Sequence, residues 1–139
     1  MGAFDGLNIS GSGLDAYRAW MEASASNVAN ANTTRTAAGG PYQRKTVVFQ
    51  ELLDVAEAGS PSTGSGVSAL AGPPDTAPFP QIFDPSHPDA DAKGFVALPN
   101  VDPVREMVDL TAATRAYEAN VAAFGATKSM LIKAMEIGR

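Results

Sequence analysis

Cysteine is absent from the 139-residue sequence, and histidine occurs only once, as His87. The absence of cysteine excludes disulfides, a thiolate nucleophile and cysteine-ligated metals. A single histidine also removes most schemes for a zinc site or a catalytic triad. We therefore expect no metal, no cofactor, no small-molecule substrate and no enzymatic activity.

Clustered positive charge and long apolar runs are also missing. The sequence contains ten Lys and Arg and fifteen Asp and Glu, which gives a net charge of -5. This charge argues against a nucleic-acid partner. No run approaches the roughly 18 apolar residues of a membrane span. Asp5 precedes the first basic residue, Arg18, so the start does not look like a cleaved secretion signal. We expect a chain that is not inserted in a membrane and that, if exported, leaves without a cleaved signal peptide.

Proline is missing from both ends, since all ten prolines lie between Pro41 and Pro103. Proline removes a backbone donor and clashes with the preceding helical turn. The sequence therefore predicts a mainly α fold with a small β region. Its parts are an N-terminal helix in residues 1–32, a central β-hairpin and loop domain in residues 33–100, and a C-terminal helix in residues 101–139.

The C-terminal part has the strongest pattern. Asp102 and Pro103 form an N-cap followed by a first-turn proline, which predicts a helix over 103–137. Glu106 and Asp109 are expected on its solvated face. Two tracks with seven-residue spacing give the a/d pattern of a coiled coil: Leu110, Tyr117, Phe124 and Leu131, and Met107, Val121 and Met135 with Thr114 and Lys128 between them.

The N-terminal part repeats this pattern more weakly. Gly11 and Gly13 lower helix propensity, so the predicted helix is sound only from about Leu14. Periodicity leaves open whether the two helices pair within one chain. Because the middle cannot cover both apolar stripes, the sequence suggests assembly with other chains. The N-terminal stripe consists of Leu7, Leu14, Met21 and Val28, with Tyr17 and Ala31 on its partner track.

The middle of the chain contains β and loop signals. Residues 45–51 (KTVVFQE) predict a strand, and residues 58–80, rich in Gly, Ser and Pro, predict a mobile loop. His87 lies near Asp84 and Asp91, which fits a turn better than a loose cation site. Trp20 and Tyr42 are expected to be packing or interface anchors rather than ligand platforms. Apolar anchors for one or two hairpins are Phe79, Ile82, Phe83, Phe95, Val96 and Leu98.

Several stretches resemble known proteins. Residues 24–34 (SASNVANANTT) resemble the N-terminal signature of bacterial flagellar rod and hook proteins. Residues 33–45 (TTRTAAGGPYQRK), 84–110 and 114–139 are similar specifically to a proximal rod member of that family. The resemblance covers nearly the whole chain; residues 55–81 carry no matching motif. Asp102-Pro103 departs from the acidic or Asn/Val residues expected at the start of the last helix.

The resemblance implies a structural role. The family's terminal segments pair as a coiled-coil-like element. Copies stack helically around a hollow channel, and the resulting shaft transmits torque. The chains pass through the flagellar type III export apparatus and assemble in the periplasm with other rod proteins. The resemblance thus implies a structural subunit of the proximal rod. The alternatives are a helical binding module that forms a small closed oligomer, and an enzyme using His87.

Two sets of residues are expected to form the assembly contacts. The polar set would fix register, by analogy with buried asparagine in coiled coils, and comprises Asn27, Asn30, Asn32 and Asn120. The helix-pairing and subunit interface comprises Leu7, Leu14, Tyr17, Met21, Val28, Met107, Leu110, Tyr117, Val121, Phe124, Leu131 and Met135.

Overall fold

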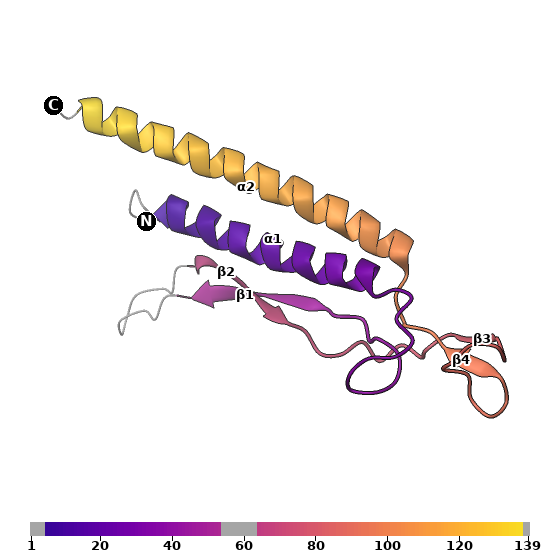
Figure 1. The fold of residues 1–139 in the computed structure, drawn as a ribbon. Helices are drawn as coiled ribbons and strands as arrows, with labels where there is room; N and C mark the ends of the chain where they lie inside the picture. The colour runs from indigo at the N-terminus through magenta and orange to yellow at the C-terminus, as the bar shows by residue number, and fades with distance from the viewer. Residues whose placement is uncertain (1–4, 54–63, 138–139) are drawn as a thin grey trace.

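The computed structural model describes residues 5–53 and 64–137. Within these ranges the chain forms two long helices and two small β-hairpins (Figure 1). This arrangement confirms a mainly α fold with a small β region. In chain order the elements are α1 (Asp5–Ala29), β1 (Val47–Leu53), β2 (Gly64–Ala71), β3 (Gln81–Phe83), β4 (Phe95–Ala97) and α2 (Pro103–Ile137).

Helix α2 has the predicted limits, Pro103–Ile137. The Oδ1 atom of Asp102 accepts hydrogen bonds from the backbone N–H groups of Val104, at 3.0 Å, and Arg105, at 3.3 Å. This side chain therefore satisfies two of the amide donors that a helix start leaves free. Asp102 is the N-cap that the sequence predicted.

Helix α1 begins at Asp5, so the prediction that it is sound only from Leu14 was wrong. Its glycines permit close packing against α2. A Cβ atom on Gly13 would lie 3.1 Å from Oδ1 of Asn120, and one on Gly6 would lie 3.4 Å from Cγ2 of Thr127. The tertiary contact with α2 outweighs the low helix propensity of these glycines.

Two glycines in the same helix provide a test of this close packing. Gly13→Leu is expected to lower the free energy of unfolding by about 1–3 kcal/mol, because the new side chain enters filled space. A Cβ atom at Gly11 would have no neighbour within 4 Å. Gly11→Leu is therefore the matched control, with an expected gain of about 0.5–1 kcal/mol from helix propensity. Thermal unfolding followed by circular dichroism measures both; equal effects would contradict the packing account.

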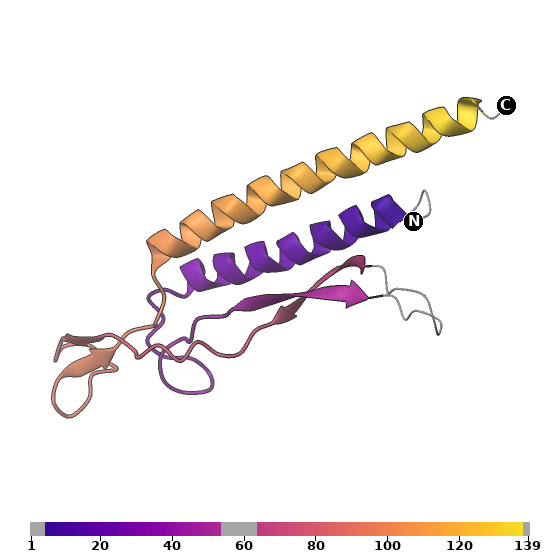
Figure 2. The ribbon, with the colours of Figure 1, turned by 180° about the vertical axis from the view of Figure 1, so that it is seen from behind.

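The two helices lie side by side and antiparallel, with both chain ends at the same end of the molecule (Figures 1 and 2). Pairing within one chain, which periodicity left open, is thus the arrangement found. Three contacting pairs show that the two helices keep one register. From the first pair to the second the sequence position changes by 14 residues on each helix, and from the second pair to the third by 7 residues on each helix. The pairs are Asn27 with Glu106, Gly13 with Asn120, and Gly6 with Thr127.

The first hairpin covers the side of α1 that faces away from α2, so α1 is the middle layer (Figures 1 and 2). Strands β1 and β2 are antiparallel, from Val47 opposite Ala71 to Leu53 opposite Gly64. The Phe49 ring lies 5.6 Å from that of Tyr17 and 5.8 Å from that of Trp20. Trp20 is therefore a packing residue.

Strand β2 lies where the sequence predicted a loop over 58–80, so that prediction was wrong for residues 64–71; residues 58–63 are outside the described ranges. The backbone N–H of Val67 donates to Oγ of Ser12 at 3.0 Å. Gly66 has a φ of +138°, and a Cβ atom there would lie 2.3 Å from Oγ of Ser12. The small residues that resemble a loop let this strand approach α1.

The second hairpin pairs β3 with β4 beyond the C-terminal end of α1 (Figure 1). The predicted Val96 is buried, and the exposed rings of Phe83 and Phe95 make a T-shaped contact at 5.3 Å. His87 lies in the connecting turn, where its Nδ1 accepts from the N–H of Asp89 at 3.1 Å. Ser86 donates from its hydroxyl and its backbone N–H to Asp84, which lowers the pKa of that carboxyl.

Residues 5–53 and 64–137 contain no cluster of His, Asp and Glu suited to hold a metal ion. Neither helix in these ranges combines the length and hydropathy needed to cross a membrane.

Candidate functional site

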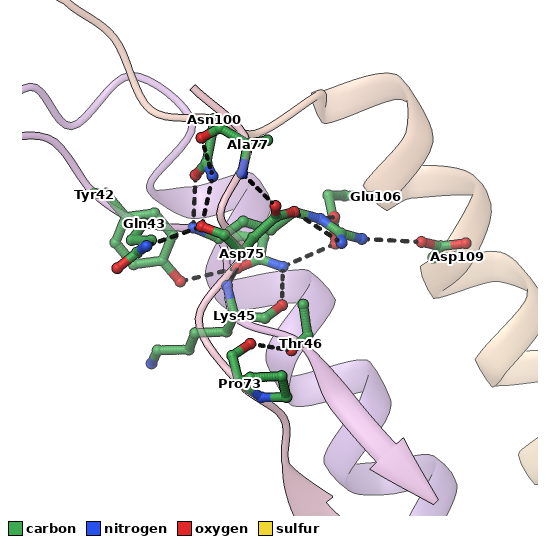
Figure 3. Close-up of polar contacts among 12 residues, drawn as sticks. Tyr42, Gln43, Lys45, Thr46, Pro73, Asp75, Ala77, Asn100, Glu106 and Asp109 are labelled. Carbon is green, nitrogen blue, oxygen red and sulfur yellow. Dashed lines mark hydrogen bonds and ion pairs between the residues drawn. The ribbon is translucent and has the colours of Figure 1, made fainter. Parts of the chain in front are cut away.

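The most densely connected polar region lies where the end of α1 and the start of α2 meet three connecting segments: the one from α1 to β1, the one from β2 to β3 and the one from β4 to α2 (Figure 3). Glu106 and Asp109 project from the first turns of α2 toward these segments. We call this region the polar junction. Its members are Asn27, Tyr42, Arg44, Asp75, Asn100, Glu106 and Asp109.

Asn27 occupies the centre of the polar junction and is 1% exposed. Its Oδ1 accepts from the Tyr42 hydroxyl at 3.0 Å and from the backbone N–H of Lys45 at 2.9 Å. Its Nδ2 donates to the carbonyl of Lys45 at 2.9 Å and to Oε2 of Glu106 at 3.0 Å. The amide thus has two acceptor and two donor contacts, so only a side chain with both functions fits.

Arg44 and Glu106 form the charged part of the polar junction. The Nε of Arg44 donates to Oε1 of Glu106, whose side chain is 1% exposed. The guanidinium also lies 3.6 Å from Oδ2 of both Asp75 and Asp109. Burial opposes the charge on Arg44, but the hydrogen bond to Glu106 and the three carboxylate charges together raise the pKa of the guanidinium. This arginine therefore stays charged. It is held by two carboxylates of α2 and by Asp75 of the segment between β2 and β3.

Asn100 and neighbouring side chains tie the connecting segments to each other. Oδ1 of Asn100 accepts from the backbone N–H of Arg44 at 2.9 Å, and its Nδ2 lies 3.3 Å from the carbonyls of Asp75 and Ala77. Oγ1 of Thr46 donates to the carbonyl of Pro73 at 2.7 Å. These contacts fix the path of the chain between the helix pair and the hairpins.

The sequence-based expectation that Glu106 and Asp109 lie on a solvated face was wrong for Glu106. Heptad spacing could have revealed it, because Glu106 lies in phase with Ala113, Asn120 and Thr127, the residues of α2 that face α1. Arg44 and Asp75 were not singled out at all. No short sequence pattern links these two residues, since their contact depends on the fold.

The predicted polar residues lie in different surroundings. Asn27 is in the polar junction, and Asn120 packs against Gly13. Nδ2 of Asn30 donates to the carbonyl of Ser26 at 2.8 Å, just after the end of α1, whereas Asn32 is exposed. A register role for these asparagines stays a prediction.

The predicted apolar interface is divided by the fold. Half-buried positions are Leu7, Leu14, Tyr17, Met21 and Val28 on α1, and Leu110, Tyr117, Phe124 and Leu131 on α2. Met107, Val121 and Met135 are 53%, 48% and 66% exposed. The residues of α2 that contact α1 most closely each come one position before the track of Met107 and Val121. They are small or polar and let the backbones approach: Glu106, Ala113, Asn120 and Thr127. Contact of the exposed residues with another subunit stays a prediction.

The polar junction holds its charged groups in contact with one another, and among the described residues no buried side-chain nitrogen or oxygen lacks a hydrogen-bond partner. The geometry therefore fits a structural joint between the helix pair and the outer hairpins.

Known proteins with similar sequences belong to the bacterial flagellum. A family model described as "Flagella basal body rod protein" matches residues 7–35. A second, "Flagellar basal body rod FlgEFG protein C-terminal", matches residues 92–137. These two segments contain most of α1 and all of α2.

Curated relatives match over nearly the full length. The flagellar basal-body rod protein FlgC of Bacillus subtilis (strain 168) is 45% identical over 150 aligned residues, covering 100% of both chains. The proteins of the same name from Borreliella burgdorferi and Escherichia coli O157:H7 are 38% and 41% identical. The Borreliella burgdorferi alignment covers 99% of this chain and 98% of the relative, and the Escherichia coli alignment covers 96% of each.

Proposed function

The chain belongs to the FlgC family of flagellar basal-body rod proteins, and from this premise we propose that it is a structural subunit of the proximal rod. Its copies would assemble helically through α1 and α2 into a hollow shaft that transmits torque. Many packed helix contacts, rather than one reactive site, would carry the load.

The single observation that supports this proposal most is the uncovered outer face of α2. Val104, Met107, Val108 and Val121 are each about half exposed or more, although α2 is paired with α1 over much of its length. Soluble monomers rarely leave such a surface free. Contacts between this face and a different face of the next subunit would not close on themselves, so they would produce a filament.

The location and partners follow from the same proposal. The chain would lie in the basal body, on the periplasmic side, in contact with copies of itself and other rod proteins. It would reach that place through the type III export apparatus without a cleaved signal peptide. Membership of a structural rod family argues for a role without catalysis.

Val121→Asp tests the proposed assembly face. Because Val121 is 48% exposed in one chain, its replacement should leave the folded subunit's thermal unfolding unchanged. A charge buried between subunits is costly, so rod assembly and swimming should be lost while export continues. Motility, exported protein and recovered basal bodies are the measurements. The matched control is Thr76→Asp, at an exposed position in the segment between β2 and β3. Swimming should persist in this strain.

Normal swimming of the Val121→Asp strain would count against this assignment of the face. A discrete dimer or trimer of the unmodified chain in light scattering would favour the closed binding module instead. Loss of motility on His87→Ala, with basal bodies intact, would favour an enzyme.

A further inference from the structure

One side chain, that of Asp89, fastens the second hairpin (residues 81–97) to the rest of the chain. Its Oδ2 accepts from the Thr34 hydroxyl at 2.8 Å, and its Oδ1 lies 3.4 Å from Nη1 of Arg35. Both partners belong to the segment that follows α1. Among the described residues, the other hydrogen bonds and ion pairs of this hairpin stay within it. We call the two Asp89 contacts the latch.

Little else holds this hairpin in place. It lies beyond the end of α1 (Figure 1), and neither β3 nor β4 packs on another of the described helices and strands. An element with few tertiary contacts opens at a low cost in free energy. The position of the second hairpin therefore depends on the latch.

His87 positions the residue that forms the latch. Its Nδ1 accepts from the backbone N–H of Asp89 at 3.1 Å, and its carbonyl accepts from the N–H of Ala90 at 3.0 Å. A ring nitrogen can accept a hydrogen bond only while it carries no proton. Histidine is also the side chain whose charge ordinarily changes between about pH 5 and 8. The contact that orients Asp89 is therefore one that acid removes.

The charges around His87 favour opening once the ring is protonated. An imidazolium would compete with Thr34 and Arg35 for the Asp89 carboxylate. Arg35 is the charged residue of the segment on the other side of the latch, so it repels the imidazolium only while the latch is closed. The charged groups of the hairpin itself accompany His87 whether the latch is closed or open: Asp84, Asp89, Asp91 and Lys93.

We propose that the second hairpin is a pH-sensitive arm, latched to the segment after α1 while His87 is neutral and released when His87 is protonated. The released state takes up a proton, so it is favoured as the pH falls. Release would open the cleft of about 350 Å³ between the hairpin and that segment, which is lined by Thr34, Arg35, Pro41, Pro88, Asp89 and Ala97. This inference concerns the single chain and goes beyond the proposed function.

Two spin labels can report the state of the latch, because the full-length chain contains no cysteine of its own. Ala37→Cys labels the segment after α1 and Ala92→Cys labels the hairpin, both at exposed positions. Electron paramagnetic resonance gives the distribution of distances between the labels at about pH 8 and about pH 5.5. We expect a single narrow distribution at the higher pH and one about twofold wider at the lower pH.

Two further variants of the labelled chain separate the roles of His87 and Asp89. His87→Asn keeps an acceptor oxygen at the position of Nδ1 but does not titrate, so its distribution should stay narrow at both pH values. Asp89→Ala removes the latch itself, so its distribution should be wide at both pH values. Circular dichroism should show the same helical signal in all of these samples, since the helix pair does not take part.

Four outcomes would overturn the inference. The labelled chain with His87 could keep a narrow distribution at the lower pH, which would show that no release occurs. The His87→Asn chain could widen equally, which would assign the effect to carboxylates. The Asp89→Ala chain could stay narrow, which would show that Asp89 is not the latch. Loss of the helical signal at the lower pH would show that the whole chain unfolds rather than the arm alone.

Discussion

Replacing Arg44 by alanine is expected to lower the free energy of unfolding by about 3–5 kcal/mol, the usual cost of removing one partner of a buried ion pair. Glu106 is 1% exposed, and Arg44 is the positively charged partner of its carboxylate. Without Arg44, the Glu106 carboxylate would keep only the Asn27 amide and would lie near Asp109. The loss should appear in urea unfolding at neutral pH.

Arg18→Ala is the matched control for that experiment. Arg18 also pairs with a glutamate, Glu22, at 3.0 Å, but both side chains are about two-thirds exposed or more. Exposed pairs within a helix contribute little, so a change below about 0.5 kcal/mol is expected. If Arg44→Ala and Arg18→Ala had equal effects, the polar junction would not be the joint described here.

Asn27→Asp is expected to destabilise the chain by about 3 kcal/mol or more, although it changes only one atom of the side chain. The change removes both amide donors, so the Lys45 carbonyl and Glu106 lose a partner. It also places a second carboxylate about 3 Å from that of Glu106, where two buried like charges repel. Uptake of one proton relieves this repulsion, so the loss should be smaller in acid than at neutral pH.

The control is Asn32→Asp, an identical exchange at an exposed position three residues beyond α1. Its expected effect is within about 0.5 kcal/mol, since surface substitutions away from such contacts are nearly neutral. Unfolding free energies of both variants at two pH values decide the matter. An Asn27→Asp protein as stable as the Asn32→Asp protein would show that the four contacts of Asn27 contribute nothing to stability.

The sequence predicted α2 well because its signals are local. Asp102 and Pro103 define the start within adjacent residues, and the apolar spacing continues to the end of the helix. The Phe83 and Phe95 hairpin was likewise visible as an apolar group in a polar region. Such features depend on residues that are near one another in the chain.

The parts that the sequence did not predict depend on contacts between distant residues. The glycines in α1 lower helix propensity, and only the neighbouring α2 explains why the helix continues through them. Strand β2 consists mainly of small residues, so its pairing with β1 and its contact with Ser12 left no alternating pattern to detect. Small side chains look like a loop when their partners are unknown.

The polar junction illustrates the same limit at the candidate site. Asn27 was singled out as a register residue. Its partners are Glu106 on α2 and Lys45 in the segment between α1 and β1, which lie 79 and 18 positions away in the sequence. Glu106 looked solvated because acidic residues are common in the first turn of a helix. The heptad pattern indicated the helix pair, yet the large apolar residues are not the ones that lie closest to α1.

A reconstruction of the basal-body rod that resolves the side chains of this chain would test the central claim most directly. The account predicts that every copy keeps the contact of Asn27 with Glu106, and that neighbouring subunits cover Met107, Val121 and Met135. Copies in which these three side chains remain in solvent, or in which the helices have separated at the polar junction, would contradict it.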